Sequence, residues 1–179
     1  MSLTLATLLP GLVLCVFGAA LLFGGKAFAA LCKAFPRSPA AAVICFGGGA
    51  LWFLYEVWHL PQADFGEYHV ILTIGFALLA VLAFSAIPDF LAVRGLAVLV
   101  LLSASPLLMA AYMEYDHPQR LCMVTLVFVA IAAALYLGAS PFRLRDAFEW
   151  LFARTARVKT AGAVLLGYGA LLAVVAFTY

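Results

Sequence analysis

The sequence predicts an all-α integral membrane protein, a bundle of six transmembrane helices. Of its 179 residues, 68% are hydrophobic and 10% are charged, whereas a soluble domain carries about 25% charged residues. A soluble core of this size cannot bury so much apolar surface, so lipid must be the solvent for most of it. Six apolar segments each approach the roughly 20 residues that a helix needs to cross a bilayer core. Nine of the ten Lys and Arg residues fall in alternate links between these segments.

Each predicted span follows from its apolar run, and together they form a single domain over 1–179. The first segment has no cationic start and is followed by Gly-Gly-Lys, which indicates a retained helix rather than a cleaved signal peptide. The links are mostly short, so consecutive helices are expected to be antiparallel neighbours. We expect spans from Leu3 to Phe23, Ala40 to Trp58, His69 to Ile87, Gly95 to Met113, Leu121 to Leu137 and Thr160 to Tyr179.

The distribution of positive charge predicts the topology. Nine of the ten cations lie in the links that follow the first, third and fifth spans: Lys26, Lys33, Arg37, Arg94, Arg143, Arg145, Arg154, Arg157 and Lys159. Arg120 alone lies in a link on the opposite side of the membrane. By the positive-inside rule, the three cationic links are cytoplasmic and both termini are non-cytoplasmic. A five-span or seven-span arrangement would place cationic links on both faces. Six spans therefore fit the charges best. The expected location is the inner (cytoplasmic) membrane of a bacterium.

The longest link predicts a seventh helix, over about residues 141–155. Leu144, Ala147, Phe148, Leu151 and Phe152 follow i, i+3, i+4 spacing, with charged residues on the other side. Such a helix is expected to lie on the inner membrane surface with its cations near anionic headgroups. The alternative is a docking surface for a cytoplasmic partner.

The cysteines predict no structural disulfide. Cys15, Cys45 and Cys122 fall within apolar segments, where a thiol behaves as a small hydrophobe. Cys32 is expected in a loop on the cytoplasmic side, and the cytoplasm is a reducing compartment.

Candidate metal ligands gather on the predicted outer face. The second span ends with Glu56-Val-Trp-His59, and the fourth ends with Glu114-Tyr-Asp-His117. Residues at i and i+3 share a helix face, and paired Glu-x-x-His motifs hold metals in helical bundles. These four residues therefore predict a divalent-metal site. The alternative is a set of solvated helix ends, because Pro61 and Pro118 follow the two motifs and proline ends helices.

The interiors of the spans contain almost nothing ionisable, which counts against a proton-driven pump. Gly47, Gly48 and Gly49, with Ser103, Ser105 and Pro106, are candidate positions for a solute pathway through broken helices. Close helix packing is the favoured reading for the three glycines. Pro106 is expected to kink its helix, and the serine hydroxyls are expected to bond the carbonyl that it frees.

Function is predicted only as a class. The chain contains no GxSxG, HExxH, Walker, GxGxxG or CxxCH motif, which favours a non-catalytic role over an enzyme. The net charge of +2 does not suggest nucleic acid. We expect a bilayer-embedded accessory subunit that binds other membrane subunits or a second copy of itself, with lipid or quinone between helices. A stand-alone transporter or channel and a metal-binding protein or enzyme are the alternatives, and the sequence requires no cofactor.

Overall fold

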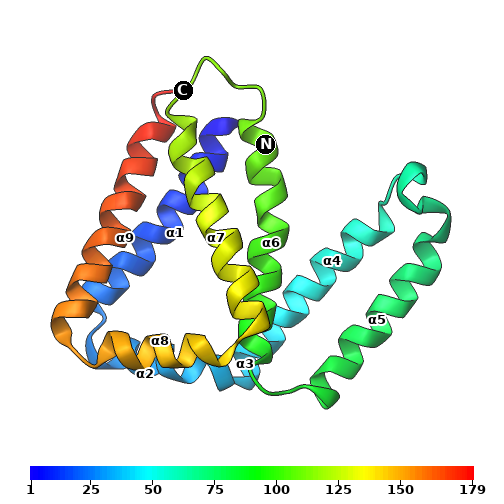
Figure 1. Ribbon diagram of the computed structural model, residues 1–179, viewed down its shortest axis with the longest axis horizontal. Coiled ribbons are helices and arrows are strands. Elements are labelled where there is room, and N and C mark those ends of the chain that lie inside the picture. The colour runs from blue at the N-terminus through cyan, green and yellow to red at the C-terminus, as the bar shows by residue number, and fades with distance from the viewer.

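The computed structural model describes residues 1–179 and contains α-helices but no strand (Figure 1). Six helical segments are long and apolar enough to cross a membrane, which confirms the predicted number and type. Five of the segments are built on α1 (Leu3–Phe23), α5 (His69–Ala86), α6 (Leu91–Ala111), α7 (Arg120–Ala139) and α9 (Thr155–Ala176). The remaining segment, Pro39–Trp58, joins α3 (Pro39–Ala42), the π-helical turn η2 (Val43–Gly47) and α4 (Gly48–Trp58).

Charged residues account for the largest errors in the predicted boundaries. α6 begins at Leu91 rather than Gly95, and α9 begins at Thr155 rather than Thr160. In both helices the residues before the predicted start include Lys or Arg. A prediction based on hydropathy excludes such residues from a span. Lys and Arg are nonetheless good helix formers, and their long stems reach polar surroundings from inside a span.

Two shorter helices, α2 (Gly25–Ala34) and α8 (Phe142–Phe152), run across one end of the spans and contact each other (Figure 1). α8 lies within the predicted segment 141–155. α2, which continues into the 3-10 turn η1 (Phe35–Arg37), replaces a predicted link. Cys32 is therefore not in a loop but buried on α2, and burial raises the pKa of its thiol.

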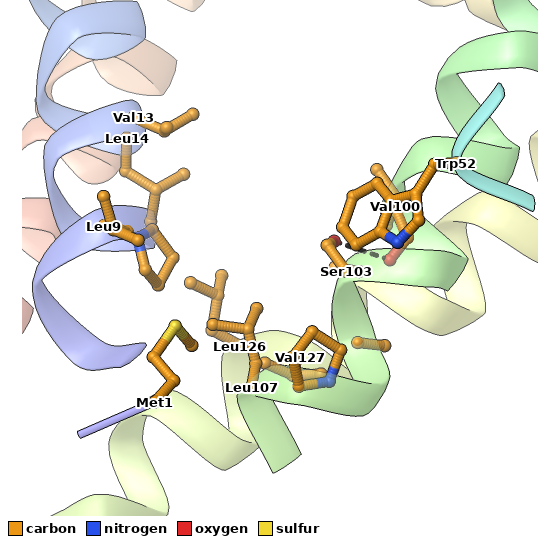
Figure 2. Close-up of a pocket in the computed structure, with 14 residues that line it drawn as sticks. Met1, Leu9, Val13, Leu14, Trp52, Val100, Ser103, Leu107, Leu126 and Val127 are labelled. Atoms are coloured by element: carbon orange, nitrogen blue, oxygen red, sulfur yellow. Dashed lines mark hydrogen bonds between the residues drawn. The ribbon is translucent and has the colours of Figure 1, made fainter. Parts of the chain in front are cut away.

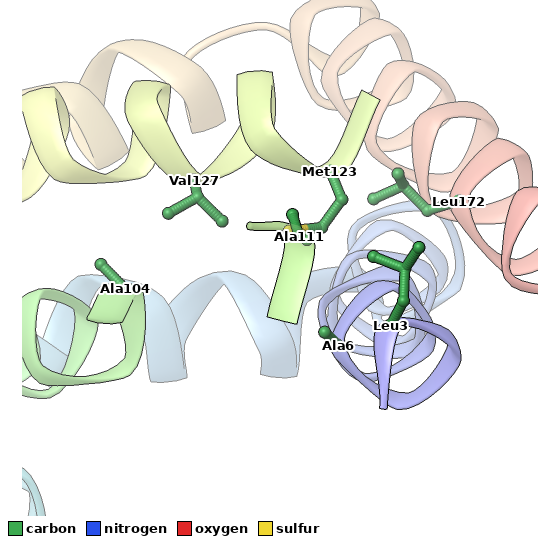
Figure 3. Packing of buried hydrophobic residues seen from close by; sticks show 7 residues of the cluster. All are labelled: Leu3, Ala6, Ala104, Ala111, Met123, Val127 and Leu172. Carbon is green, nitrogen blue, oxygen red and sulfur yellow. The ribbon is translucent and has the colours of Figure 1, made fainter. Parts of the chain in front are cut away.

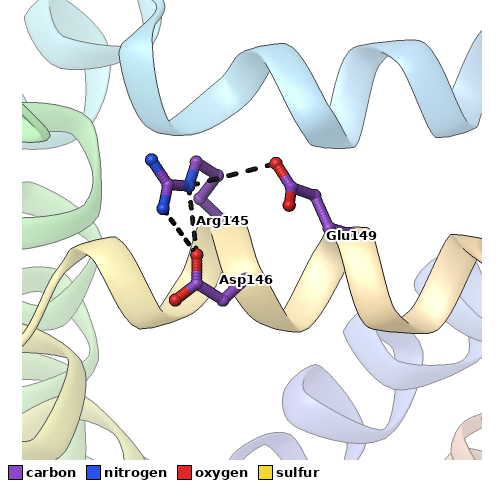
Figure 4. Close-up of polar contacts among 3 residues, drawn as sticks. All are labelled: Arg145, Asp146 and Glu149. Carbon is purple, nitrogen blue, oxygen red and sulfur yellow. Dashed lines mark hydrogen bonds and ion pairs between the residues drawn. The ribbon is translucent and has the colours of Figure 1, made fainter.

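On α8, Arg145 forms an ion pair with its neighbour Asp146 (Figure 4). Arg145 Nη2 donates to Asp146 Oδ1 at 2.8 Å, and Arg145 Nε lies 4.0 Å from a Glu149 oxygen. Its hydrogen bond to the Asp146 carboxylate raises the pKa of Arg145 above its ordinary value. Because the side chains are well exposed, screening by solvent keeps their contribution to stability small.

The molecule has two chemically different ends. The terminal face carries both chain ends, the segment 59–68 with its 3-10 turns η3 (Gln62–Asp64) and η4 (Gly66–Tyr68), and the loop 112–119 (Figure 1). The basic face, at the opposite end, is made of α2, η1, α8, the turn 87–90 and the first turns of α6 and α9. Nine of the ten cations lie on these elements or, for Arg154, in the short link between α8 and α9. Arg120, at the start of α7, lies at the terminal face.

The most extensive helix pairing joins α1 to α9, the first and last spans (Figure 1). Gly11 and Gly18 of α1 meet Gly162 and Gly169 of α9. A Cβ atom added at Gly18 would lie 2.6 Å from the Leu166 nitrogen, and one added at Gly169 would lie 2.7 Å from the Gly11 oxygen. These distances show backbone packed directly on backbone, as small residues allow in membranes.

The expectation that consecutive spans are neighbours fails at two places. α1 packs along α9 and not along the second span, Pro39–Trp58. α5 does not pack along α6, although only the turn 87–90 separates them. Phe90 in that turn has a left-handed φ of 58°. The hairpin of α4 and α5 therefore diverges from the rest of the molecule (Figure 1).

The main core lies toward the terminal face and joins α1, α6, α7 and α9 (Figure 3). Met123 and Leu172 are completely buried there, with Ala6 and Ala111 filling the narrow spaces between helices. A second contact holds α6 against η2, where a Cβ atom at Gly95 would lie 2.2 Å from the Phe46 nitrogen. α6 is thus the helix that connects the two halves of the fold.

Candidate functional site

Glu56 and His59 lie at the end of α4, on the terminal face, and each is engaged within its own helix. Trp52 Nε1 donates to Glu56 Oε1 at 3.0 Å. His59 Nδ1 lies 2.8 Å from the carbonyl oxygen of Tyr55, which can only accept, so this nitrogen donates. The His59 ring also stacks against Tyr55, with the ring centroids 4.2 Å apart.

Glu114 and His117 do not form a helical pair. α6 ends at Ala111, so both residues lie in the loop 112–119. The His117 and Tyr179 rings meet edge to face, with the centroids 5.4 Å apart. Pro118 disfavours the α-helical region at His117 alone. The helix has already ended before Glu114, because Tyr112 is extended and Met113 has a left-handed φ of 62°.

The four candidate metal ligands therefore belong to two separate places on the terminal face. Glu56 and His59 sit on the diverging hairpin, and Glu114 and His117 sit above α6 and α7 (Figure 1). The structure contains no group of three or more His, Cys, Asp or Glu side chains that could hold a metal ion. The metal site stays a prediction, without support from this arrangement.

The three glycines of the second span behave differently from one another. A Cβ atom at Gly49 would lie 3.2 Å from Val98 of α6, so this residue packs against its neighbour. Gly47 and Gly48 have open space on their free sides. Close packing thus describes Gly49 alone, and none of the three glycines lines the cavity of about 500 Å3 between α1, α6 and α7.

Ser103 and Pro106 line that cavity, whereas Ser105 is exposed and does not. The hydroxyl of Ser103 donates to the Val100 carbonyl at 2.8 Å. The carbonyl that Pro106 leaves without a donor belongs to Leu102, four residues before it. A serine hydroxyl reaches back to position i−3 or i−4, so Ser103 cannot bond the Leu102 carbonyl and the expectation is wrong for this residue. Ser105 stands three residues after Leu102, but its hydroxyl forms no hydrogen bond with that carbonyl in the structure.

The cavity has a volume of about 500 Å3 and is partly open (Figure 2). Its walls come from α1, α6 and α7, with Trp52 contributed by α4. Eleven of its 14 lining residues are hydrophobic, and none carries a charged side chain. Binding pockets for small molecules commonly have volumes of about 300–1,000 Å3. The cavity is thus large enough to hold a ligand, and its chemistry suits an apolar one.

Sequence reasoning identified Ser103 and Pro106 but did not connect them to α1. Pro10, Leu14 and Leu9 complete the cavity from that helix. The two prolines were a usable sign of this cavity. Pro10 and Pro106 both lie in the half of their helix that is nearer the terminal face, and a proline interrupts close helix packing.

Comparisons of this chain with protein-family models, with curated proteins and with solved structures find no match. The assignment of function therefore rests on the residues and the geometry described above.

Proposed function

We propose that this chain is a non-catalytic subunit of a larger membrane assembly, and that α5 is the helix through which it binds its neighbour. One observation supports this proposal above others. None of the 18 residues of α5 is buried, whereas each of the other five spans contains buried residues.

The contacts of α5 explain its exposure. α5 packs along α4, where the Phe53 and Phe76 rings meet edge to face with centroids 5.0 Å apart. At its end nearer the basic face, Phe84 meets Phe46 in the same way, at 5.4 Å. Large apolar side chains cover the rest of the helix, including Leu78, which is 60% exposed.

A membrane helix with one neighbour along its length is a natural surface for assembly. Lipid tails are as apolar as leucine, so helices associate in membranes through close packing rather than through a hydrophobic force. Most of the surface of α5 contacts no other helix of its own chain. Another subunit, or a second copy of this chain, would supply the missing contacts.

The proposed arrangement places the basic face in the cytoplasm and the terminal face outside, in a bacterial cytoplasmic membrane. The separation of nine cations from Arg120 supports this orientation by the positive-inside rule. α2 and α8 would then lie on the cytoplasmic membrane surface with their lysines and arginines near anionic headgroups. Labelling of single cysteines in intact cells tests the orientation, because a membrane-impermeant maleimide should reach the loop 112–119 and not α8.

A photo-crosslinking amino acid at Leu78 tests the role of α5. In native membranes it should crosslink to one defined protein species, and the chain should migrate in mild detergent as an assembly larger than its own 19.1 kDa. The same amino acid at Val164 of α9, which is 63% exposed, is the matched control and should crosslink to no such species. A monomeric chain with only lipid adducts at Leu78 would contradict the proposal.

A pair of glycine variants gives a second test. Gly75 of α5 and Gly167 of α9 both have open space on their free sides. A leucine at either position should leave the isolated chain folded, but Gly75→Leu should reduce recovery of the assembly while Gly167→Leu should not. Equal recovery with both variants would place the neighbour elsewhere.

A further inference from the structure

The cavity among α1, α6 and α7 lies at a defined depth in the membrane. On α7, its lining residues Leu126 and Ala130 follow the start of the helix at Arg120 by about 9 and 15 Å, at 1.5 Å per residue. On α6, Leu107 and Val100 precede the end at Ala111 by about 6 and 17 Å. Half of a bilayer core is about 15 Å thick. The cavity therefore occupies the leaflet nearer the terminal face.

The two hydrogen-bonding side chains on the cavity walls already have partners. Ser103 donates its hydroxyl to the Val100 carbonyl, and Trp52 donates its indole N–H to Glu56. An ion, a sugar or a nucleotide would lose its hydration here without gaining partners. An occupant must be apolar along the length that enters the cavity.

The walls also explain why the chain does not close the cavity itself. Figure 2 shows Leu9, Val13 and Leu14 of α1 on one side and Trp52, Val100 and Ser103 on the other, with open space between them. Small lining residues such as Ala104 and Ala130 leave space between the walls that larger side chains would fill. A much smaller apolar cavity of about 150 Å3 is already able to hold benzene.

We propose that this cavity binds one acyl chain of a phospholipid from the leaflet nearer the terminal face. The cavity is partly open, and the hydrocarbon that surrounds a membrane helix at this depth consists of acyl chains. A chain that enters sideways fills apolar space with apolar groups and keeps its headgroup in the interface. Lipid binding here needs neither α5 nor a partner subunit, so it is independent of the proposed assembly.

Photo-labelling of the full chain in nanodiscs tests this site. The discs contain phosphatidylethanolamine and phosphatidylglycerol, with a trace of phosphatidylcholine that carries a diazirine near the end of one acyl chain. Irradiation followed by mass spectrometry should place the adducts on lining residues of α1, α6 and α7 in preference to the exposed faces of α5. Adducts spread evenly over all exposed helix faces would overturn the proposal.

Two variants on α7 make the test specific. Ala130→Phe fills the cavity and should reduce the cavity adducts several-fold. Ala132→Phe places the same ring on an exposed part of the same helix and should leave them unchanged. Ser103→Leu fills the cavity from α6 and replaces Ala130→Phe if circular dichroism shows that the latter does not fold. Undiminished labelling in a folded, filled variant would reject the acyl-chain site.

Discussion

Replacement of Gly18 by alanine should loosen the pairing of α1 with α9, the largest helix interface in the molecule. A Cβ atom there would lie 2.6 Å from the Leu166 nitrogen and 2.9 Å from the Gly162 oxygen. Both are backbone atoms and cannot rotate away. An ordinary contact begins at 3.4 Å, so the helices must separate by about 0.8 Å at this point (3.4 minus 2.6). Overpacking of this kind typically costs about 1–3 kcal/mol.

The matched control for this variant is Gly167→Ala. Both positions lie inside helices, so both substitutions gain the same helix propensity, about 0.8–1 kcal/mol. A Cβ atom at Gly167 meets nothing within 4 Å. The difference in unfolding free energy between the two variants therefore isolates the packing cost, and it should be about 1–3 kcal/mol with Gly18→Ala the less stable.

Unfolding in mixed micelles by titration with sodium dodecyl sulfate, followed by far-ultraviolet circular dichroism, measures this difference. Hydrogen exchange should show faster exchange in α1 and α9 of Gly18→Ala and unchanged exchange in α5. If the two variants unfold within about 0.5 kcal/mol of each other, the ordinary range for surface substitutions, the close approach of α1 and α9 is wrong.

Three further predictions concern other contacts. Gly95→Ala should displace η2 from α6, because its Cβ would lie 2.2 Å from the backbone nitrogen of Phe46. Gly48→Ala should cause no displacement, since its Cβ would meet nothing within 4 Å. The distance between spin labels on the α4–α5 hairpin and on α7 measures the displacement. Tyr168→Phe removes a 2.8 Å hydrogen bond to the Cys122 carbonyl and should cost about 0.6 kcal/mol in the same unfolding assay. The thiol of Cys32 should react with maleimide more slowly at neutral pH than a cysteine placed on the exposed side of α2. Burial raises the pKa of the Cys32 thiol, and only the thiolate attacks maleimide. Equal rates would contradict the burial of Cys32.

The local properties of the chain made the spans predictable. A run of about 20 apolar residues leaves a helix as the one way to satisfy its backbone in lipid. The regular alternation of cationic links also anticipated that nine of the ten cations would share one face of the molecule. α2 was missed because its lysines interrupt the apolar run, although Phe28 and Cys32 share one side of that helix by their i, i+4 spacing.

The candidate sites depended on which helices meet, and a sequence read one helix at a time does not contain that information. Glu56-x-x-His59 and Glu114-x-x-His117 resemble each other in sequence, but α4 diverges with α5 while the second motif lies in a loop. Ser103 and Pro106 were identified on α6, yet the cavity they line exists only because Leu9, Pro10 and Val13 stand opposite them.

The sequence by itself determined that this is an all-helical chain with six apolar helices long enough to cross a membrane, because hydrophobicity and charge act locally on each segment. Only the tertiary structure decided that α1 pairs with α9, that α5 stands apart and that one cavity opens between α1, α6 and α7. The physical reason is that apolar helices in lipid have no hydrophobic preference among partners. Their choice depends on the fit of small residues such as Gly18 and Gly169 across an interface, which no property of one helix alone specifies.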